Sequence, residues 1–225
     1  MYNNDHLICA GAWDDYYRSG IFANRWPADV AVRVLGRLVR NRKELLVNGF
    51  ADIGCGLGRH LWLAHELGFR ELVGIEVSQV ALEQAQKRWG DKLDVEWSLM
   101  PECTPEFKAE TIMCWGVLDH MYRATGAELL CNIREKMGSS GCLITAVKGK
   151  GHAEFREVDQ VEQDVLPDVS DAQEPGIPQR FFSSNDMSQM LEAAGFEILE
   201  HVVSNLHFTH LGKVFEMHIH VSQPS

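Results

Sequence analysis

The chain has 225 residues, of which 45% are hydrophobic and 24% are charged, a composition typical of a soluble globular protein. Disordered, collagen-like and coiled-coil classes are thereby excluded for the chain as a whole. The formal net charge of −11 opposes contact with a polyanion, so we expect no nucleic-acid partner. The sequence holds no run of about 18 apolar residues, so we expect no membrane span.

The cysteines and the N-terminal residues indicate a reducing compartment. The six cysteines form no C-x-x-C pair and show no framework spacing, which favours reduced thiols. The first fifteen residues lack a basic region followed by an apolar core, so no secretory signal is expected. We therefore predict a cytoplasmic protein.

Helical and strand-like patterns alternate along the chain. Apolar residues recur at helical spacing after Pro27, and short apolar runs separate the helices. Ser78 should cap one helix, and Thr125 with Glu128 should form a capping box for another. The pattern predicts helices near 29–41, 61–67, 79–89, 126–137 and 184–194, and strands near 48–53, 71–77, 93–97, 111–115, 142–147, 196–203 and 214–221.

The connections between these elements predict an α/β fold. Helices join the early strands, so those strands should run parallel with right-handed crossovers. Only about ten residues separate the last two strands, and none of them is typical of a helix. These two strands should therefore form an antiparallel hairpin.

We expect residues 1–225 to form a single domain with two additions. Residues 1–43 should form an N-terminal helical cover, which is aromatic between Trp13 and Trp26. Residues 148–180 interrupt the alternation, are rich in acids and hold three prolines. They are interpreted as a lid-like insertion, with a solvated loop as the alternative.

Residues 50–60, Phe-Ala-Asp-Ile-Gly-Cys-Gly-Leu-Gly-Arg-His, are the most informative segment. A strand runs into three alternate glycines, Gly54, Gly56 and Gly58, which permit positive φ and close approach of a ligand. The N-terminus of the next helix favours a carboxylate, and Asp52 can accept hydrogen bonds or balance a cation. Dinucleotide binders use G-x-G-x-x-G, whereas this spacing suits a ligand with an ammonium and a carboxylate.

A second acidic residue follows at the end of the second predicted strand. Glu76 lies 18 residues after Gly58. A carboxylate at that place can accept both hydroxyls of a ribose.

Together these motifs resemble those of the class I S-adenosylmethionine (SAM)-dependent methyltransferases, and the resemblance runs from Trp13 to Val221. Residues 114–120, Cys-Trp-Gly-Val-Leu-Asp-His, resemble the loop after that family's fourth strand. Residues 130–147 resemble its next helix, glycine turn and fifth strand. The resemblance implies a Rossmann-like, doubly wound seven-stranded sheet, order 3-2-1-4-5-7-6, with an antiparallel last strand and SAM as cofactor.

The resemblance also assigns residues to the cofactor. The Asp that usually holds adenine after the third strand is missing, and Ser98, Glu102 or the backbone of Leu99 and Met100 are the candidates to replace it. The aromatic N-terminal segment should close over SAM, and packing on the sheet edge is its alternative. The predicted cofactor-binding residues are Asp52, Gly54, Cys55, Gly56, Glu76, Val77, Leu99, Met100, Trp115, Tyr17 and Arg25.

The acceptor side rests on fewer residues. His120, after the fourth strand, is the predicted catalytic residue, a general base for a hydroxyl, amine or thiol. A hydrogen bond to cofactor or backbone is the alternative for His120. Arg180 and Phe181 should contact the substrate, with Arg180 pairing an anionic group. The late histidines show no spacing for a fourth ligand, so no metal is predicted.

We therefore predict a SAM-dependent methyltransferase that acts on O, N or S of a small molecule, as a monomer or homodimer. A SAM-binding sensor or partner subunit without catalysis is the alternative. An NAD-binding oxidoreductase is disfavoured by the glycine spacing.

Overall fold

The structure is a computed structural model that describes residues 5–20, 26–100, 109–155, 177 and 179–225. The chain forms two compact units, Met1–Met113 and Cys114–Ser225, and each is described by itself. That residues 1–225 act as a single domain stays a prediction.

The described strands form a seven-stranded sheet in the order β3-β2-β1-β4-β5-β7-β6. Strand β1 is parallel to β2 and β2 to β3, whereas β7 is antiparallel to both β5 and β6. The predicted order and the antiparallel last strand are confirmed. The boundary between the two units falls within β4, Thr111–Trp115.

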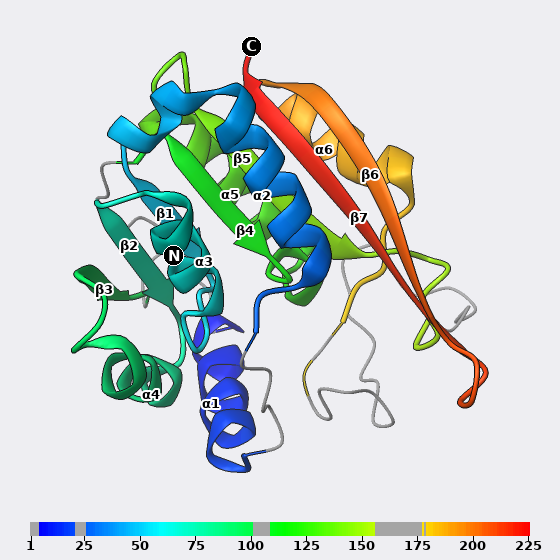
Figure 1. Ribbon diagram of the computed structural model, residues 1–225. Coiled ribbons are helices and arrows are strands. Elements are labelled where there is room, and N and C mark those ends of the chain that lie inside the picture. Colours follow the sequence, from blue (N-terminus) through cyan, green and yellow to red (C-terminus); the bar gives the residue numbers. More distant parts are fainter. Residues whose placement is uncertain (1–4, 21–25, 101–108, 156–176, 178) are drawn as a thin grey trace. The chain divides into compact units, whose positions relative to one another are not determined.

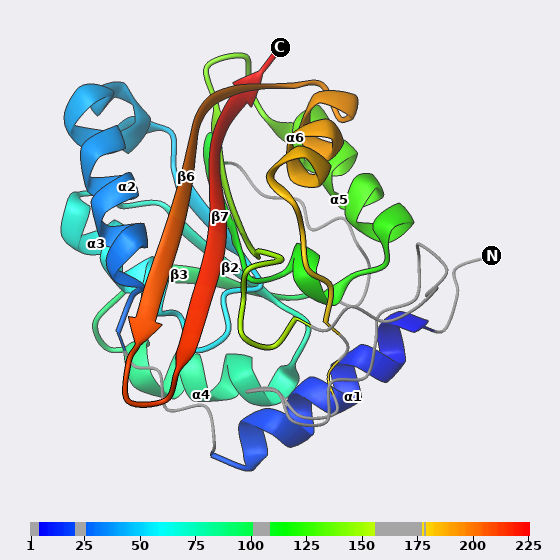
Figure 2. The ribbon, with the colours of Figure 1, turned by 90° about the vertical axis from the view of Figure 1, so that its right-hand side faces the viewer.

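The first unit consists of three strands and the helices around them. Strands β1 and β2 are buried along their whole length, because both are apolar on both faces. Helix α2 turns Val34 and Leu35 inward and leaves Arg33 and Arg37 exposed. Helices α1 and α4 lie side by side in both ribbon views (Figures 1 and 2). The elements are α1 (Asp5–Arg18), α2 (Asp29–Asn41), η1 (Lys43–Val47), β1 (Phe50–Ile53), α3 (Arg59–Leu67), β2 (Leu72–Glu76), α4 (Gln79–Trp89) and β3 (Val95–Leu99).

The second unit is dominated by a long hairpin of β6 and β7, which Figure 2 shows as two neighbouring strands joined at one end. Helices α5 and α6 lie on the same side of this hairpin in that view. Strand β5 is buried at all seven residues. The elements are η2 (Leu118–His120), α5 (Arg123–Lys136), β5 (Cys142–Lys148), α6 (Ser184–Ala193), β6 (Phe196–Phe208) and β7 (Lys213–Pro224).

The capping box predicted at Thr125 and Glu128 is wrong. Helix α5 already begins at Arg123, after an N-cap residue, Tyr122, whose side chain makes no capping hydrogen bond. The N–H of Gly126 donates to the carbonyl of Tyr122, so Thr125 already lies within the first helical turn. Both predicted capping residues therefore lie inside the helix.

A capping box does occur before α6, where the sequence analysis placed none. The Ser183 hydroxyl accepts the Asp186 N–H, and the Asp186 carboxylate accepts the Ser183 N–H. The last two strands are also longer than predicted, because backbone pairing continues past the apolar stretch to the turn at 209–212. Strand β3 begins two residues later than predicted.

Two smaller expectations concern cysteines and membranes. Cys55, Cys114, Cys131 and Cys142 are free thiols in the described part of the chain. No helix among the described residues is both long and apolar enough to cross a membrane. Most of the predicted lid, residues 156–176 and 178, lies outside the described residues.

Candidate functional site

The glycine-rich loop joins β1 to α3 in the left-handed backbone conformation that the motif predicts. Gly54, Gly56 and Gly58 have φ of 71°, 52° and 74°. Other L-residues adopt such angles only with strain. A Cβ on Gly56 would lie 2.7 Å from the Tyr17 hydroxyl, and one on Gly58 would lie 3.0 Å from the Trp89 ring. A larger residue at Gly56 or Gly58 would therefore be strained by its φ and would have to move Tyr17 or Trp89.

Glu76 holds this loop from the end of β2. Its Oε2 accepts the Gly56 N–H at 2.7 Å, and its Oε1 accepts the N–H groups of Val77 and Ser78 at 2.8 and 3.0 Å. A carboxylate has about four acceptor positions, so these bonds leave room for about one more. We expected Glu76 to accept both hydroxyls of a ribose, and this geometry leaves room for about one of them.

The N–H groups of Gly56, Val77 and Ser78 occupy the other acceptor positions of the Glu76 carboxylate.

Burial and hydrogen bonding act on Glu76 in opposite directions. Burial raises the pKa of this carboxyl, and the three N–H donors from Ser78, Gly56 and Val77 lower it, with the net direction upward. The nearby Asp14 carboxylate adds to the rise. Ionising Glu76 in its buried position therefore costs free energy. A hydroxyl or a cation bound against the carboxylate would offset part of that cost.

Asp52 lies in β1, one residue before its end, in a fully buried position, and neither of its carboxyl oxygens has a hydrogen-bond partner. Burial raises the pKa of Asp52 to about 8, an effect that the Arg59 charge partly offsets. The His60 Nδ1 lies 3.9 Å from Asp52 Oδ2, and burial holds the pKa of His60 well below its usual value. A buried acid without a partner is costly, which fits a place for a cationic group of a ligand.

Helix α1 brings Tyr17 to the loop. Tyr17 is buried, and it packs with Trp13 and Tyr16 in an aromatic cluster with ring centroids 5.6–6.0 Å apart. Asp14 lies on the same helix and contacts the start of α4, where its Oδ1 accepts the Ser78 hydroxyl at 2.6 Å. The sequence analysis did not identify Asp14, although its spacing of three residues from Tyr17 places both on one helix face.

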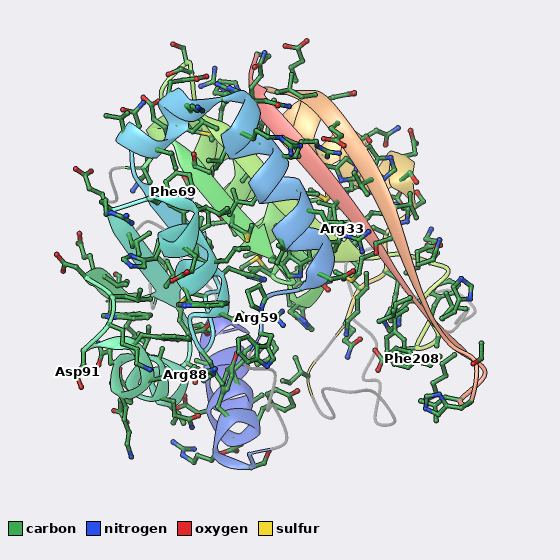
Figure 3. All side chains as sticks on the ribbon, in the orientation of Figure 1. Arg33, Arg59, Phe69, Arg88, Asp91 and Phe208 are labelled. Atoms are coloured by element: carbon green, nitrogen blue, oxygen red, sulfur yellow. The ribbon has the colours of Figure 1, made fainter. Side chains whose placement is uncertain are left out.

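A second aromatic group lies on the other side of the loop. The rings of Trp62 and Trp89 stack at 6.1 Å, and the Trp89 Nε1–H donates to the carbonyl of Leu57. Arg88 lies over the Trp89 ring at 4.7 Å. Figure 3 labels Arg59 at the start of α3 and Arg88 at the end of α4, on the helices that flank the loop.

The remaining predicted cofactor residues of the first unit lie in the glycine-rich loop and at the ends of β2 and β3. The Met100 N–H donates to the carbonyl of Glu76, so the chain after β3 stays paired with β2. Leu99 is 40% exposed, and Cys55 is buried in the loop, where burial raises its pKa. Arg25 lies outside the described residues. The cofactor roles of all these residues stay predictions.

In the second unit, β4 leads into a short helix that carries His120. Asp119 and His120 are both buried, and the His120 N–H donates to the carbonyl of Val117. Arg180 approaches the same turn, because its N–H donates to the Asp119 carbonyl at 2.6 Å. Trp115, the last residue of β4, is also buried. The structure thus brings the predicted residues His120 and Arg180 to one turn.

A buried polar network at the end of β5 was not predicted. The Lys148 ammonium donates to Gln179 Oε1 at 2.7 Å and pairs with Glu154 at 3.3 Å. His152 lies beside Glu154, with its Nδ1 3.8 Å from the carboxylate. All four side chains are buried. Their sequence signal was weak, because Gln179 is 31 residues from Lys148 and falls at the end of an irregular segment.

The residues directly after Gln179 pack against aromatic rings. Phe181 contacts the rings of His152 and Phe155 at 5.8 and 5.6 Å. The Arg180 guanidinium lies over the Phe182 ring at 4.6 Å. The two predicted substrate residues, Arg180 and Phe181, therefore flank the network, and their contact with substrate stays a prediction.

Three late histidines stack across the hairpin. The ring of His201 lies 4.3 Å from His220 and 5.3 Å from His218. His218 Nε2 lies 3.2 Å from Glu216. In the part of the chain that the structure describes, no group of three or more His, Cys, Asp or Glu side chains is arranged to hold a metal. Phe208, which Figure 3 labels, lies seven residues after His201 along β6, where the hairpin turns.

Comparison with known proteins identifies the family. A family model described as a methyltransferase domain matches residues 50–201. The chain is 33% identical over 112 residues to a tRNA U34 carboxymethyltransferase of Pseudoalteromonas translucida, which covers 48% of this chain and 34% of that protein. It is 30% identical over 166 residues to that of Vibrio atlanticus, which covers 69% of this chain and 46% of that protein. The chain thus spans less than half the length of these relatives.

Solved structures agree on the fold. A SAM-dependent methyltransferase from Anabaena variabilis has a TM-score of 0.69 and 20% identity, over 96% of this chain and 95% of that one. The magnesium protoporphyrin IX methyltransferase of Synechocystis, solved with bound SAM, has a TM-score of 0.63 and 16% identity, over 100% and 99%. On the match of the family model and on this fold, the chain belongs to the class I SAM-dependent methyltransferases.

Proposed function

We propose that this methyltransferase transfers the methyl group of SAM to a small-molecule acceptor. The observation that carries the proposal is the set of buried polar side chains at the ends of β4 and β5, with Asp119, His120, Lys148, Glu154 and Gln179 among them. Sites for small molecules are typically enclosed and hold a few convergent polar groups. A polymer would need an open, basic surface instead, and the net charge of −11 opposes a polyanion.

The first unit offers a matching set of groups for SAM. The buried Asp52 carboxyl is suited to the ammonium of the methionine part, and the last acceptor position of Glu76 is suited to a ribose hydroxyl. The loop at Gly54–Gly58 permits close approach of a ligand. These residues therefore fit SAM in charge and in hydrogen-bonding capacity.

Methyl transfer from SAM requires the protein mainly to place the acceptor atom against the methyl group. SAM would supply an activated methyl group: the acceptor atom would attack the methyl carbon in line, and the bond from that carbon to sulfur would break as S-adenosylhomocysteine leaves. Catalysis then consists mainly of orientation, and of removing a proton where the acceptor is a hydroxyl, amine or thiol. His120 is the residue that we propose for that proton, and Arg180 is suited to an anionic group of the acceptor.

The test is a transfer assay with methyl-labelled SAM. The purified protein is incubated with a metabolite extract below about 1 kDa and, in parallel, with total tRNA from the same cells. Label in a product from the small-molecule extract is the expected result. Label that enters tRNA alone would overturn the small-molecule acceptor.

A tRNA acceptor is the second candidate, and the similarity to tRNA U34 carboxymethyltransferases favours it. Exposed arginines on α2, among them Arg33, Arg37 and Arg40, supply local positive charge. Arg33 is paired with Asp29, however, and the similarity covers only 34–46% of those relatives. The labelled-tRNA arm of the assay decides between the two acceptors.

A further inference from the structure

The Asp14 carboxylate joins helix α1 to the start of α4. Asp14 Oδ1 accepts the Ser78 hydroxyl at 2.6 Å and the Val80 N–H at 3.2 Å. Val80 lies in the first turn of α4, where N–H groups have no partner within the helix. The helix dipole also favours a negative charge at that end. Asp14 therefore accepts a hydrogen bond from an N–H group in the first turn of α4, and the same contact fixes the position of α1.

The same contact reaches the glycine-rich loop through Ser78. The Ser78 hydroxyl donates to Asp14 and accepts the Ala81 N–H at 3.1 Å, so both of its roles are used. The Ser78 N–H donates to Glu76, which in turn accepts the Gly56 N–H. A continuous hydrogen-bonded path thus runs from α1 to the loop.

Tyr17 returns to that loop from α1. Its hydroxyl lies so close to Gly56 that a Cβ there would be 2.7 Å away. The carbonyl of Tyr17 accepts a hydrogen bond from Gln84 Nε2 at 3.3 Å, which is a second contact between α1 and α4. Because Asp14 and Tyr17 are three residues apart on one helix, the position of Asp14 sets the position of Tyr17.

We propose that Asp14 is a positioning residue for the cofactor, which seats α1 through Ser78 and Val80 so that Tyr17 closes the glycine-rich loop over bound SAM. The inference rests on the proposed placement of SAM at this loop. Seating of α1 and binding of the cofactor are then coupled, and each strengthens the other by the same factor. Asp14 touches no reacting atom in this role.

The chain offers a matched control in the next residue. Asp15 has the same charge, lies on the same helix and is paired with Arg18, but its side chain is 81% exposed. Asp15→Ala therefore removes one negative charge and one ion pair without removing the contact with α4. Asp14→Asn is the conservative variant, because its side-chain oxygen can still accept both hydrogen bonds.

The experiment measures affinity for S-adenosylhomocysteine by calorimetry in each variant, with folding checked by circular dichroism. Asp14→Ala should bind about tenfold more weakly, the usual effect of losing hydrogen bonds to a charged group. Asp14→Asn, which keeps the acceptor oxygen without the charge, should lose less affinity than Asp14→Ala, and Asp15→Ala should stay close to the wild type. Equal affinity in Asp14→Ala and Asp15→Ala, or tighter binding in Asp14→Ala, would overturn the proposal.

A second measurement needs no variant. Trypsin cleavage after Arg18, the last residue of α1, should be slowed by S-adenosylhomocysteine in the wild-type protein, because the ligand stabilises the seated helix. Unchanged cleavage would contradict the coupling.

Glu76→Ala separates this inference from the proposed function. Weaker binding in Glu76→Ala with normal binding in Asp14→Ala would remove only the role of Asp14. Normal binding in Glu76→Ala would instead remove the placement of SAM at this loop.

Discussion

The Glu76 carboxylate and the Gly56 N–H are joined by a hydrogen bond of 2.7 Å, across 20 residues of sequence. This bond ties the end of β2 to the loop after β1. It gives Glu76 a structural task in addition to the predicted contact with ribose. Loss of Glu76 should therefore disturb both the loop and the ligand.

Glu76→Ala should weaken binding of SAM by about 1.5–3 kcal/mol, because three backbone N–H groups and a ribose hydroxyl lose a charged acceptor. Calorimetry with S-adenosylhomocysteine measures the change. Glu71→Ala, an exposed residue just before β2, is the control and should bind normally. A folded Glu76→Ala protein with wild-type affinity would show that Glu76 contributes nothing to the cofactor.

Asp52 should make cofactor affinity depend on pH. Its pKa of about 8 means that most of the carboxyl is protonated at pH 7, mainly because it is buried. A cationic ligand favours the ionised form, so binding below pH 8 must release a proton. Affinity should rise by up to about tenfold per pH unit from pH 6 toward 8 and then level off.

Calorimetry at pH 6, 7 and 8, in buffers with different ionisation heats, measures this proton release. Asp52→Asn cannot ionise and should lose the slope, whereas the exposed Asp91→Asn should keep it. The same slope in Asp52→Asn and in the wild type would exclude Asp52 as the titrating group.

The sequence predicted the strand order through its resemblance to the methyltransferase family, and it predicted the glycine conformations from a local motif. Buried strands appear in the sequence as runs of apolar residues. Only glycine adopts a positive φ readily, and Gly54 and Gly56 do so in the structure. The glycine motif was interpreted as space for a ligand. The structure adds a second reason at Gly56, the close approach of Tyr17 from a distant helix.

The contacts that the sequence did not predict join residues far apart in the chain. Asp14 meets Ser78 across 64 residues, and Lys148 meets Gln179 across 31. No periodic pattern encodes such pairs, because each depends on how two elements pack. The capping box at Thr125 failed for the opposite reason: the local pattern was present, but the helix begins three residues earlier, at Arg123.

The histidine stack should destabilise the fold in acid. Burial, with the charges of His201 and His218, lowers the pKa of His220 to about 3, whereas an unfolded histidine titrates near 6.5. Between these values the unfolded chain binds a proton that the folded chain excludes, so stability falls as the pH drops below about 6.5. The loss approaches about 1.4 kcal/mol per pH unit for one such group.

Urea unfolding at pH 7, 6 and 5 measures this loss. His220→Phe keeps an aromatic ring beside His201 and removes the titrating group, so its stability should fall less steeply with acid. The exposed His210→Phe serves as the control and should follow the wild type. An identical acid slope in His220→Phe would place the sensitivity elsewhere.

If His120 is the general base, His120→Ala should lower the methyl-transfer rate by roughly 10²–10⁴-fold, the usual contribution of such a group. Affinity for S-adenosylhomocysteine should stay close to the wild type, because removing a proton from the acceptor needs no contact with the cofactor. Single-turnover rates with the acceptor found by the labelling assay measure the effect, and His210→Ala, exposed on the turn between β6 and β7, controls for loss of a histidine. Since His120 is buried, the His120→Ala variant must first be shown to unfold at the same temperature as the wild-type protein. A mutant with normal turnover, or with weak cofactor binding as its only defect, would leave His120 a structural residue of the turn after β4. An acceptor that is already a thiolate needs no base, so the test applies to a hydroxyl or amine acceptor.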